Sequence, residues 1–311
     1  MVIGVIGCGN VGFAFLRWLH ERGYRTLGFD VSESVRAKIS KVIGSSSCAD
    51  SFETLRVCDC IFICVPTEPC IDGSVDMSIF DLTIRRIRDN LRFEKRVSVI
   101  QRSTCLPGCA EYYSSMLGDN ISYGVNPSFL RKSTIQYDTE RPDRVAYAAT
   151  GLARSHLDLI YTGVSGSRYI SESYKSVELL KYAENTLDGL LISYWNELLS
   201  YAKKISLSAD EFINLIEHIG DRDKFCTVAR IPGKAFSLSC IPKDLLGLVI
   251  EMKRLGVKPN VLEGALETNE AIKQEFGDST SPAQDLWKLY DGRFVTLNMG
   301  RAQVSSFFEK I

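Results

Sequence analysis

Short apolar runs alternate with amphipathic segments along the first half of the chain. Runs at 2–6, 24–29 and 60–65 have strand length and are rich in β-branched or other apolar residues. Further strands are predicted at 96–101 and 145–150, and helices at 13–22, 79–90 and 111–117. Such alternation predicts a parallel sheet with helices on both faces, in which ligands bind at the carboxyl ends of the strands.

The pattern changes to long helical segments after about residue 172. The stretch 173–206 contains no proline and only one glycine, which favours one long helix. Helices are also predicted at 209–219, 244–255 and 260–275, with a short strand at 295–297 as the remaining expectation. We therefore predict an α/β fold: a Rossmann doubly wound parallel sheet in a domain at 1–172, then a long central helix and a smaller all-helical domain at 173–311.

Composition narrows the class of protein. The chain has 311 residues, 45% of them hydrophobic and 24% charged, with a net charge of −1, as in ordinary globular proteins. It has no run of more than two consecutive basic residues, so no nucleic-acid partner is expected. The sequence shows neither an export signal nor a membrane-spanning apolar run, which predicts a cytoplasmic protein with no membrane partner.

Cysteine and histidine usage limits the available chemistry. The ten cysteines are expected to be reduced thiols, and none is paired in a C-x-x-C turn, so no metal site is predicted. The three histidines lie in no motif. Acid–base chemistry must then depend on lysine, carboxylates or water.

A glycine motif directly follows the first predicted strand. Gly7, Gly9 and Gly12 form G-x-G-x-x-G, with Asn10 and Val11 inside it, and a helical pattern follows. These glycines permit a tight turn, the approach of a pyrophosphate, and close helix–strand packing. The second strand ends at Asp30, whose carboxylate would accept hydrogen bonds from a ribose diol and repel a 2′-phosphate. The motif predicts NAD rather than NADP.

Polar residues at two strand ends and on the long helix are candidates for the remaining site. Thr67 and Thr104 each follow a predicted strand, although serine and threonine also occur there simply as turn formers. Lys181 and Asn185 are four residues apart and therefore share a helix face. They either project into a cleft between the domains or belong to an exposed polar stripe.

Cys240 lies at the start of a predicted helix. Pro242 suits the first helical position and Gly256 a C-cap. The free amides and dipole of a helix N-terminus, with Lys243 nearby, would favour a thiolate. The alternative is a buried structural cysteine.

Taken together, these segments resemble the UDP-glucose/GDP-mannose (nucleotide-sugar) dehydrogenase family. The resemblance rests on motifs that occur in family order as far as about residue 275: GCGNVG at 7–12, CVPT at 64–67, STCLPG at 103–108, NPSFLRK at 126–132, VELLKYAENT at 177–186 and SCIPKD at 239–244. The family oxidises a sugar primary alcohol twice, reduces two NAD⁺ and forms a carboxylate.

The resemblance implies a role for each matched residue. Cys240 would attack the intermediate aldehyde, giving a thiohemiacetal and then a thioester that water hydrolyses. Lys181 and Asn185 would stabilise the oxyanion, while Asp244 and Thr104 would order the water and the lysine. Cofactor contacts are implied for Val65, Pro66, Thr67 and Thr104 besides the glycine motif, and substrate contacts for Ser128, Phe129, Leu130, Lys132, Lys181, Asn185 and Phe236. The implied substrate is a nucleotide-linked or phosphorylated sugar-like alcohol, and the implied assembly a homodimer.

The chain also departs from the family pattern. Ser128 replaces a glutamate that assists water or proton transfer, and Lys132 replaces a second one. Ala235, Ser237 and Leu238 replace glycines ahead of the cysteine, and the chain stops near where the family's third, nucleotide-clamping domain begins. Thioester hydrolysis is therefore expected to be slow, so that an acyl-enzyme accumulates or oxidation stops at the aldehyde.

Two other functions remain open at this point. A two-electron β-hydroxyacid-type dehydrogenase would share the Rossmann domain, Lys181 and Asn185 but need no cysteine. A non-catalytic NAD-binding relative would keep the cofactor fold without turnover. Function depends on the site rather than the fold. Full activity of Cys240→Ser would favour the β-hydroxyacid-type reaction, and NAD⁺ affinity without hydride transfer to any ligand would favour the non-catalytic relative.

Overall fold

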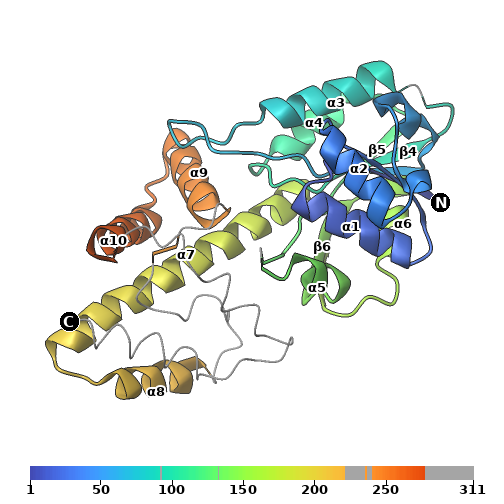
Figure 1. The fold of residues 1–311 in the computed structure, drawn as a ribbon. Coiled ribbons are helices and arrows are strands. Elements are labelled where there is room, and N and C mark those ends of the chain that lie inside the picture. The colour runs from blue at the N-terminus through green and yellow to red at the C-terminus, as the bar shows by residue number, and fades with distance from the viewer. Residues whose placement is uncertain (92, 132, 221–234, 237–239, 277–311) are drawn as a thin grey trace. The chain divides into compact units, whose positions relative to one another are not determined.

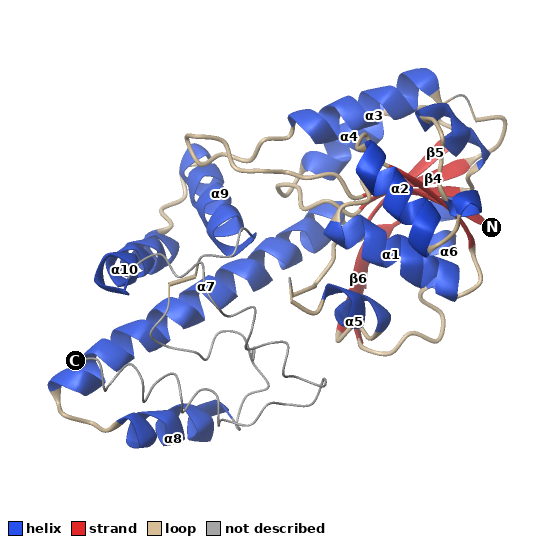
Figure 2. Ribbon diagram, in the orientation of Figure 1, coloured by secondary structure: helices blue, strands red, loops and turns tan. Residues whose placement is uncertain are grey.

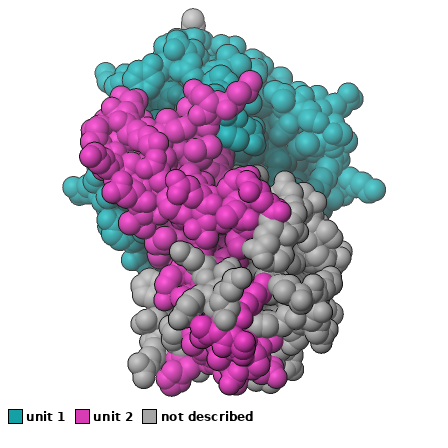
Figure 3. Space-filling model, turned by 90° about the vertical axis from the view of Figure 1, so that its left-hand side faces the viewer, with its two compact units in different colours: residues 1–70, 75–181 teal, residues 71–74, 182–311 magenta. Residues whose placement is uncertain are grey.

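The chain forms two compact units, which Figure 3 colours separately. This computed structural model describes residues 1–276 except 92, 132, 221–234 and 237–239. The first unit comprises Met1–Cys70 and Val75–Lys181, and the second comprises Ile71–Ser74 and the residues from Tyr182 onward. The sequence places the boundary at 172/173, ahead of the long helix, whereas the compact units divide within that helix.

The first unit is built on a seven-stranded sheet in the order β2-β1-β3-β4-β5-β6-β7. The strands are β1 Val2–Ile6, β2 Arg25–Phe29, β3 Cys60–Ile63, β4 Val97–Gln101, β5 Ile121–Val125, β6 Arg144–Ala149 and β7 Ser167–Ser171. Adjacent strands are parallel except β5 and β6, which are antiparallel. The α/β fold is confirmed with this exception, because the chain between β5 and β6 does not cross the sheet.

Helices cover both faces of this sheet (Figures 1 and 2). One hydrophobic core contains side chains of α1 (Asn10–Glu21), α2 (Glu33–Val42) and α6 (Gly151–Ile160). The other contains side chains of α3 (Ser78–Asn90), α4 (Cys109–Met116) and the 3₁₀ helix Phe52–Val57. A second 3₁₀ helix spans Ser45–Ser47, and the short helix α5 (Ile135–Glu140) packs on α1. The alternating faces of the strands thus supply a doubly wound, two-layered core.

The second unit is helical in its described residues. Its elements are the greater part of α7 (Tyr174–Lys204), with α8 (Ala209–Gly220), α9 (Cys240–Arg254) and α10 (Asn260–Phe276). One apolar cluster joins α7 to α8 through Trp195 and Phe212. Another joins α7, α9 and α10 through Ile192, Leu245 and Ala265. The predicted strand at 295–297 lies outside the described residues.

Helix α9 begins earlier than its sequence pattern indicates. Its first residue is Cys240, so Pro242 lies within the first turn, where a missing N–H removes no helical hydrogen bond. The helix ends at Arg254, and Gly256 has φ +75°, as predicted for a glycine C-cap. In the described part of the chain, no helix is long and apolar enough to cross a membrane.

An excursion of the chain after β3 contributes to the second unit. Residues 71–74 belong to that unit, although their neighbours on both sides belong to the first. A bridge between Pro69 and Val75 closes the base of this excursion. At Gly73, with φ +82°, an added Cβ would lie 2.5 Å from Leu246 of α9, so glycine is required by backbone and by space.

Candidate functional site

The glycine motif lies at the carboxyl ends of β1, β2 and β3. Gly7 has φ +83°, and its amide donates to the Phe29 carbonyl at 2.9 Å. A Cβ on Gly7 would lie 2.8 Å from the Cys64 carbonyl oxygen, and one on Gly12 would lie 1.9 Å from the Gly7 carbonyl oxygen. These two glycines are therefore required by the turn and by the approach of α1 to the sheet.

Gly9 is required by neither turn nor packing. A Cβ there would meet nothing within 4 Å, and the backbone φ of −62° suits any residue. Gly9 is the N-cap of α1, whose first residues are Asn10 and Val11, so free amides and the positive end of the helix dipole meet this open space. The arrangement fits the pyrophosphate of a dinucleotide.

Asp30 follows β2 and is hydrogen-bonded to the glycine motif. Its Oδ2 accepts a hydrogen bond from the Cys8 amide at 2.8 Å, and its Oδ1 accepts one from the Ser32 amide at 2.9 Å. The carboxylate is thus held directly beside the glycine motif. The predicted choice of NAD over NADP relies on this carboxylate and stays a prediction.

The turns after β3 and β4 are hydrogen-bonded to each other. The Thr67 hydroxyl donates to the Thr104 carbonyl at 2.8 Å, and the Ser103 hydroxyl donates to the Val65 carbonyl at 2.7 Å. Thr67 is buried, whereas Pro66 is exposed. The structure therefore brings together the cofactor residues predicted at 65–67 and Thr104, and it uses the Thr67 hydroxyl to join the turns.

A buried carboxylate at the start of α7 fixes the loop that follows Thr104. Glu178 is 2% exposed and accepts hydrogen bonds from Gln101 Nε2 at 2.9 Å, the Gly108 amide at 2.8 Å and the Ala110 amide at 3.0 Å. Burial raises the pKa of Glu178. Sequence reasoning did not assign this residue a role; the signal available was its position one turn before Lys181.

Lys181 lies beside the loop that follows β5. Its ammonium is 5.1 Å from the centre of the Phe129 ring, within cation–π range. The Arg144 guanidinium lies 5.9 Å from the same ring. Two predicted substrate residues from distant parts of the sequence thus meet in the first unit, while Lys132 lies outside the described residues.

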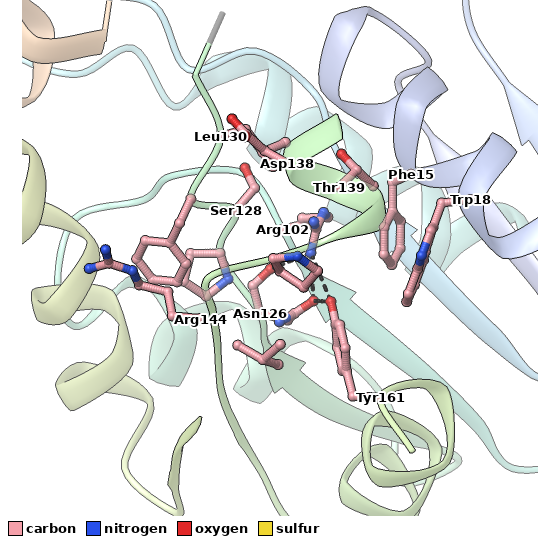
Figure 4. Close-up of a pocket in the computed structure, with 14 residues that line it drawn as sticks. Phe15, Trp18, Arg102, Asn126, Ser128, Leu130, Asp138, Thr139, Arg144 and Tyr161 are labelled. Carbon is pink, nitrogen blue, oxygen red and sulfur yellow. Dashed lines mark hydrogen bonds between the residues drawn. The ribbon is translucent and has the colours of Figure 1, made fainter. Parts of the chain in front are cut away.

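A small cavity lies behind this loop (Figure 4). Ser128, Phe129 and Leu130 line it, together with Arg102 and Asn126. Arg102 is 6% exposed; its guanidinium donates to Asn126 Oδ1 at 2.6 Å and stacks 4.0 Å from the Phe15 ring centre. The cavity volume is about 20 Å³, room for about one water molecule. No role was predicted for Arg102 or Asn126, which line the same cavity as residues 128–130.

In the second unit, α7 and α9 are joined by a buried polar cluster. The Asn185 amide donates to Asp244 Oδ2, and the Lys243 ammonium lies 2.6 Å from Asp244 Oδ1. Asp244 is 1% exposed and Asn185 8%. A buried carboxylate is stable only when it is paired and hydrogen-bonded, and here both of its oxygens have partners.

Cys240 is the first residue of α9, one turn before Asp244. Its side chain lies outside the described part of the structure, as do Ser237 and Leu238. Phe236 is 4% exposed, and its ring packs in the apolar cluster with Ile241 and Leu245. This burial gives Phe236 a packing role, and its predicted substrate contact stays a prediction.

The predicted catalytic residues fall into two groups. Thr104 and Lys181 belong to the first unit, and Asn185 and Asp244 to the second. Their convergence on one substrate stays a prediction. Among the other cysteines that the structure describes, burial raises the pKa of Cys58 and of Cys64 to about 12, so neither is a candidate thiolate nucleophile.

Three family models match the chain. The family model for the UDP-glucose/GDP-mannose dehydrogenase family, central domain, matches residues 175–271. The model for the NAD binding domain of that family matches residues 45–163. The model for the NAD binding domain of 6-phosphogluconate dehydrogenase matches residues 2–83.

Individual proteins resemble the chain over most of its length. A GDP-mannose 6-dehydrogenase of Pseudomonas putida is 25% identical over 96% of this chain and 73% of its own length. A UDP-glucose 6-dehydrogenase of Haloferax volcanii is 23% identical over 96% of this chain and 75% of its own. Among solved structures, a UDP-glucose dehydrogenase from Pyrobaculum islandicum superposes with a TM-score of 0.80 at 27% identity, covering 88% of this chain and 68% of its own.

Proposed function

We propose that this chain, which belongs to the UDP-glucose/GDP-mannose dehydrogenase family, oxidises the primary alcohol of a nucleotide-linked or phosphorylated sugar-like substrate to a carboxylate. Its cofactor is NAD, as the sequence predicts, because the family's NAD-binding domain matches residues 45–163. The open space at Gly9, at the N-terminus of α1, supports the placement of the pyrophosphate there. When bound, NAD⁺ would supply the hydride acceptor, with one NAD⁺ molecule consumed in each of the two oxidations. The glycine motif, Asp30 and the turns at 65–67 would hold it.

The observation that carries this proposal is the buried cluster of Asn185, Lys243 and Asp244. This cluster joins the first turn of α9, which begins at Cys240, to α7. Helix α7 carries Lys181 and Asn185, the predicted oxyanion donors. A two-electron alcohol dehydrogenase has no need of a cysteine at this helix start. A covalent aldehyde intermediate needs a thiolate that is fixed relative to hydrogen-bond donors.

In the proposed reaction, the Cys240 thiolate attacks the aldehyde carbon, forming a carbon–sulfur bond and an oxyanion. Lys181 and Asn185 stabilise the oxyanion, each such donor typically being worth about 3 kcal/mol in a dry site. After the second oxidation, water attacks the resulting thioester, with Asp244 and Thr104 ordering the water and the lysine. The carboxylate leaves and the thiolate is regenerated.

Ser128 bears on the last of these steps. A serine cannot act as a carboxylate base at neutral pH, so thioester hydrolysis is expected to be slower than the preceding oxidation. A burst of NADH followed by a slower steady rate would show this. Two equivalents of NADH per substrate without a burst would contradict it.

Substrate and mechanism are tested together with a panel of alcohols. The wild-type chain is assayed for NADH formation with UDP-, GDP- and CDP-sugars and with simple phosphorylated alcohols. Cys240→Ser is expected to lose the second oxidation, while the matched control Cys70→Ser, at an exposed position, is expected to retain both.

Each other outcome identifies a different function. Full activity of Cys240→Ser would overturn the thioester mechanism and favour a two-electron, β-hydroxyacid-type reaction. NAD⁺ binding in calorimetry without turnover of any member of the panel would favour a non-catalytic relative. The homodimer expected from the family resemblance is checked by light scattering of the same preparation.

A further inference from the structure

Asn269 of α10 makes both of its described contacts with the backbone of one residue. Its Oδ1 accepts a hydrogen bond from the Phe236 amide at 2.7 Å, and its Nδ2 donates to the Phe236 carbonyl at 3.2 Å. Asn269 is 3% exposed and Phe236 4%. An asparagine can satisfy an amide and a carbonyl simultaneously, so this side chain fixes the Phe236 backbone in position and in orientation.

The Phe236 side chain is fixed as well. Its ring packs with Ile241 and Leu245 of α9. On α7, a Cβ at Gly189 would lie 3.1 Å from Ile241, 3.4 Å from Leu245 and 3.7 Å from the Phe236 ring. A glycine inside a helix costs about 1 kcal/mol relative to alanine, so its presence here is explained by the close approach of these side chains.

Cys240 is therefore flanked by two anchored residues. Phe236 precedes it by four positions and Ile241 follows it directly, and both pack in the same cluster. Because the Phe236 ring packs with residues of α9, an anchor at Phe236 restricts where the first turn of α9 can lie. Helix α10, which carries Asn269, packs against α7 and α9 in the same cluster through Ala265. A separate hydrogen bond, from the Ser193 hydroxyl of α7 to the Ala265 carbonyl at 2.8 Å, does not involve Phe236.

We propose that Asn269 is a positioning residue for the proposed nucleophile: it holds Phe236, whose ring packs in the cluster of Ile241 and Leu245, and so fixes the first turn of α9, which begins at Cys240. This inference rests on the proposed function, because it assigns Cys240 the nucleophilic role. Asn269 acts through the Phe236 backbone and touches neither substrate nor cofactor.

The test compares Asn269→Ala with Ser193→Ala. Both variants remove a buried hydrogen bond of α10, so both should lower the melting temperature, and only the first releases Phe236. Two quantities are measured: the rate at which iodoacetamide alkylates Cys240, read by mass spectrometry, and kcat and KM with the substrate found in the panel. Asn269→Ala should lower both the alkylation rate and kcat at least tenfold with the KM for NAD⁺ unchanged, whereas Ser193→Ala should match wild type.

Equal alkylation rates and kcat values in the two variants would overturn the positioning role, even if the enzyme proves active. If the wild type turns over no substrate, the proposed function fails, and the alkylation comparison alone decides the role of Asn269. Faster alkylation of Cys240 in Asn269→Ala would also overturn it. Folding of the helical unit in Asn269→Ala is verified by circular dichroism and a cooperative melting transition, because NAD⁺ affinity depends on the first unit, whereas Asn269 belongs to the second.

Discussion

Replacing Gly9 by alanine should separate cofactor binding from folding at a single position. The Gly9 backbone has φ −62°, which alanine adopts without strain, and its Cβ would meet no protein atom within 4 Å. Substituting alanine for glycine at a compatible position typically stabilises the fold by about 0.4–1 kcal/mol. The melting temperature of Gly9→Ala should therefore equal or slightly exceed that of wild type.

The same methyl group should weaken NAD⁺ binding. It occupies the space in which a pyrophosphate would approach the first amides of α1, at the cost of about one charge-assisted hydrogen bond. Such a bond is worth about 1.5–3 kcal/mol, which corresponds to a roughly 10- to 150-fold rise in Kd. Isothermal titration calorimetry with NAD⁺ measures the affinity, and circular dichroism measures the melting temperature.

Two other glycines serve as controls for this experiment. Gly118→Ala also places its Cβ in open space, but away from the motif, so the Kd for NAD⁺ should be unchanged and the melting temperature should equal or slightly exceed that of wild type. Gly12→Ala places a Cβ 1.9 Å from the Gly7 carbonyl oxygen and should destabilise the fold by at least the 1–3 kcal/mol typical of overpacking. Wild-type NAD⁺ affinity in Gly9→Ala, or a fall in its melting temperature of several degrees, would refute the assignment of this space to the pyrophosphate.

Three further predictions concern other polar contacts. Asp30→Asn should raise the Kd for NAD⁺ at least tenfold and reduce the preference for NAD⁺ over NADP⁺, as measured by titrating the variant with each cofactor. Asn185→Leu removes a donor from the buried Asp244 carboxylate and should lower the free energy of unfolding by about 1–3 kcal/mol in urea titrations; an unchanged midpoint would contradict this. Burial lowers the pKa of His156, which bonds Ser98, so its folded-state pKa lies below the unfolded value of 6.5. Stability should then fall as pH drops through 6.5 toward the lowered pKa, and His156→Gln should flatten that part of the pH profile.

The sequence was sufficient for those elements whose burial produces an unbroken apolar run. β3 is buried at every position, and its residues read directly as a strand. β7 was not predicted because it is an edge strand with mostly exposed side chains, so its sequence carries no apolar pattern. β5 was not predicted either, since serine and glycine interrupt its short apolar run. The local sequence pattern reports burial, which β7 lacks; β2, at the other edge, is largely buried and was predicted.

The candidate site was predictable as a set of motifs but not as a set of contacts. The motif around Asn185 and the motif around Asp244 were both recognised, yet their hydrogen bond depends on how α7 packs on α9. Glu178 was assigned no role, because nothing in one sequence distinguishes a buried carboxylate from an exposed one. Asn269 lies in no motif, and its partner is 33 positions earlier in the chain.

Residues 71–74 make folding of the helical unit depend on a segment that is synthesised well before the rest of that unit. They are synthesised within the first third of the chain, but Leu246 and Ile250, against which Gly73 packs, emerge from the ribosome much later. The helical unit therefore cannot complete its structure from its own contiguous sequence. A break in the chain at 181/182 would leave the C-terminal fragment without these four residues, so the fragment should fold fully only when the N-terminal fragment is supplied with it.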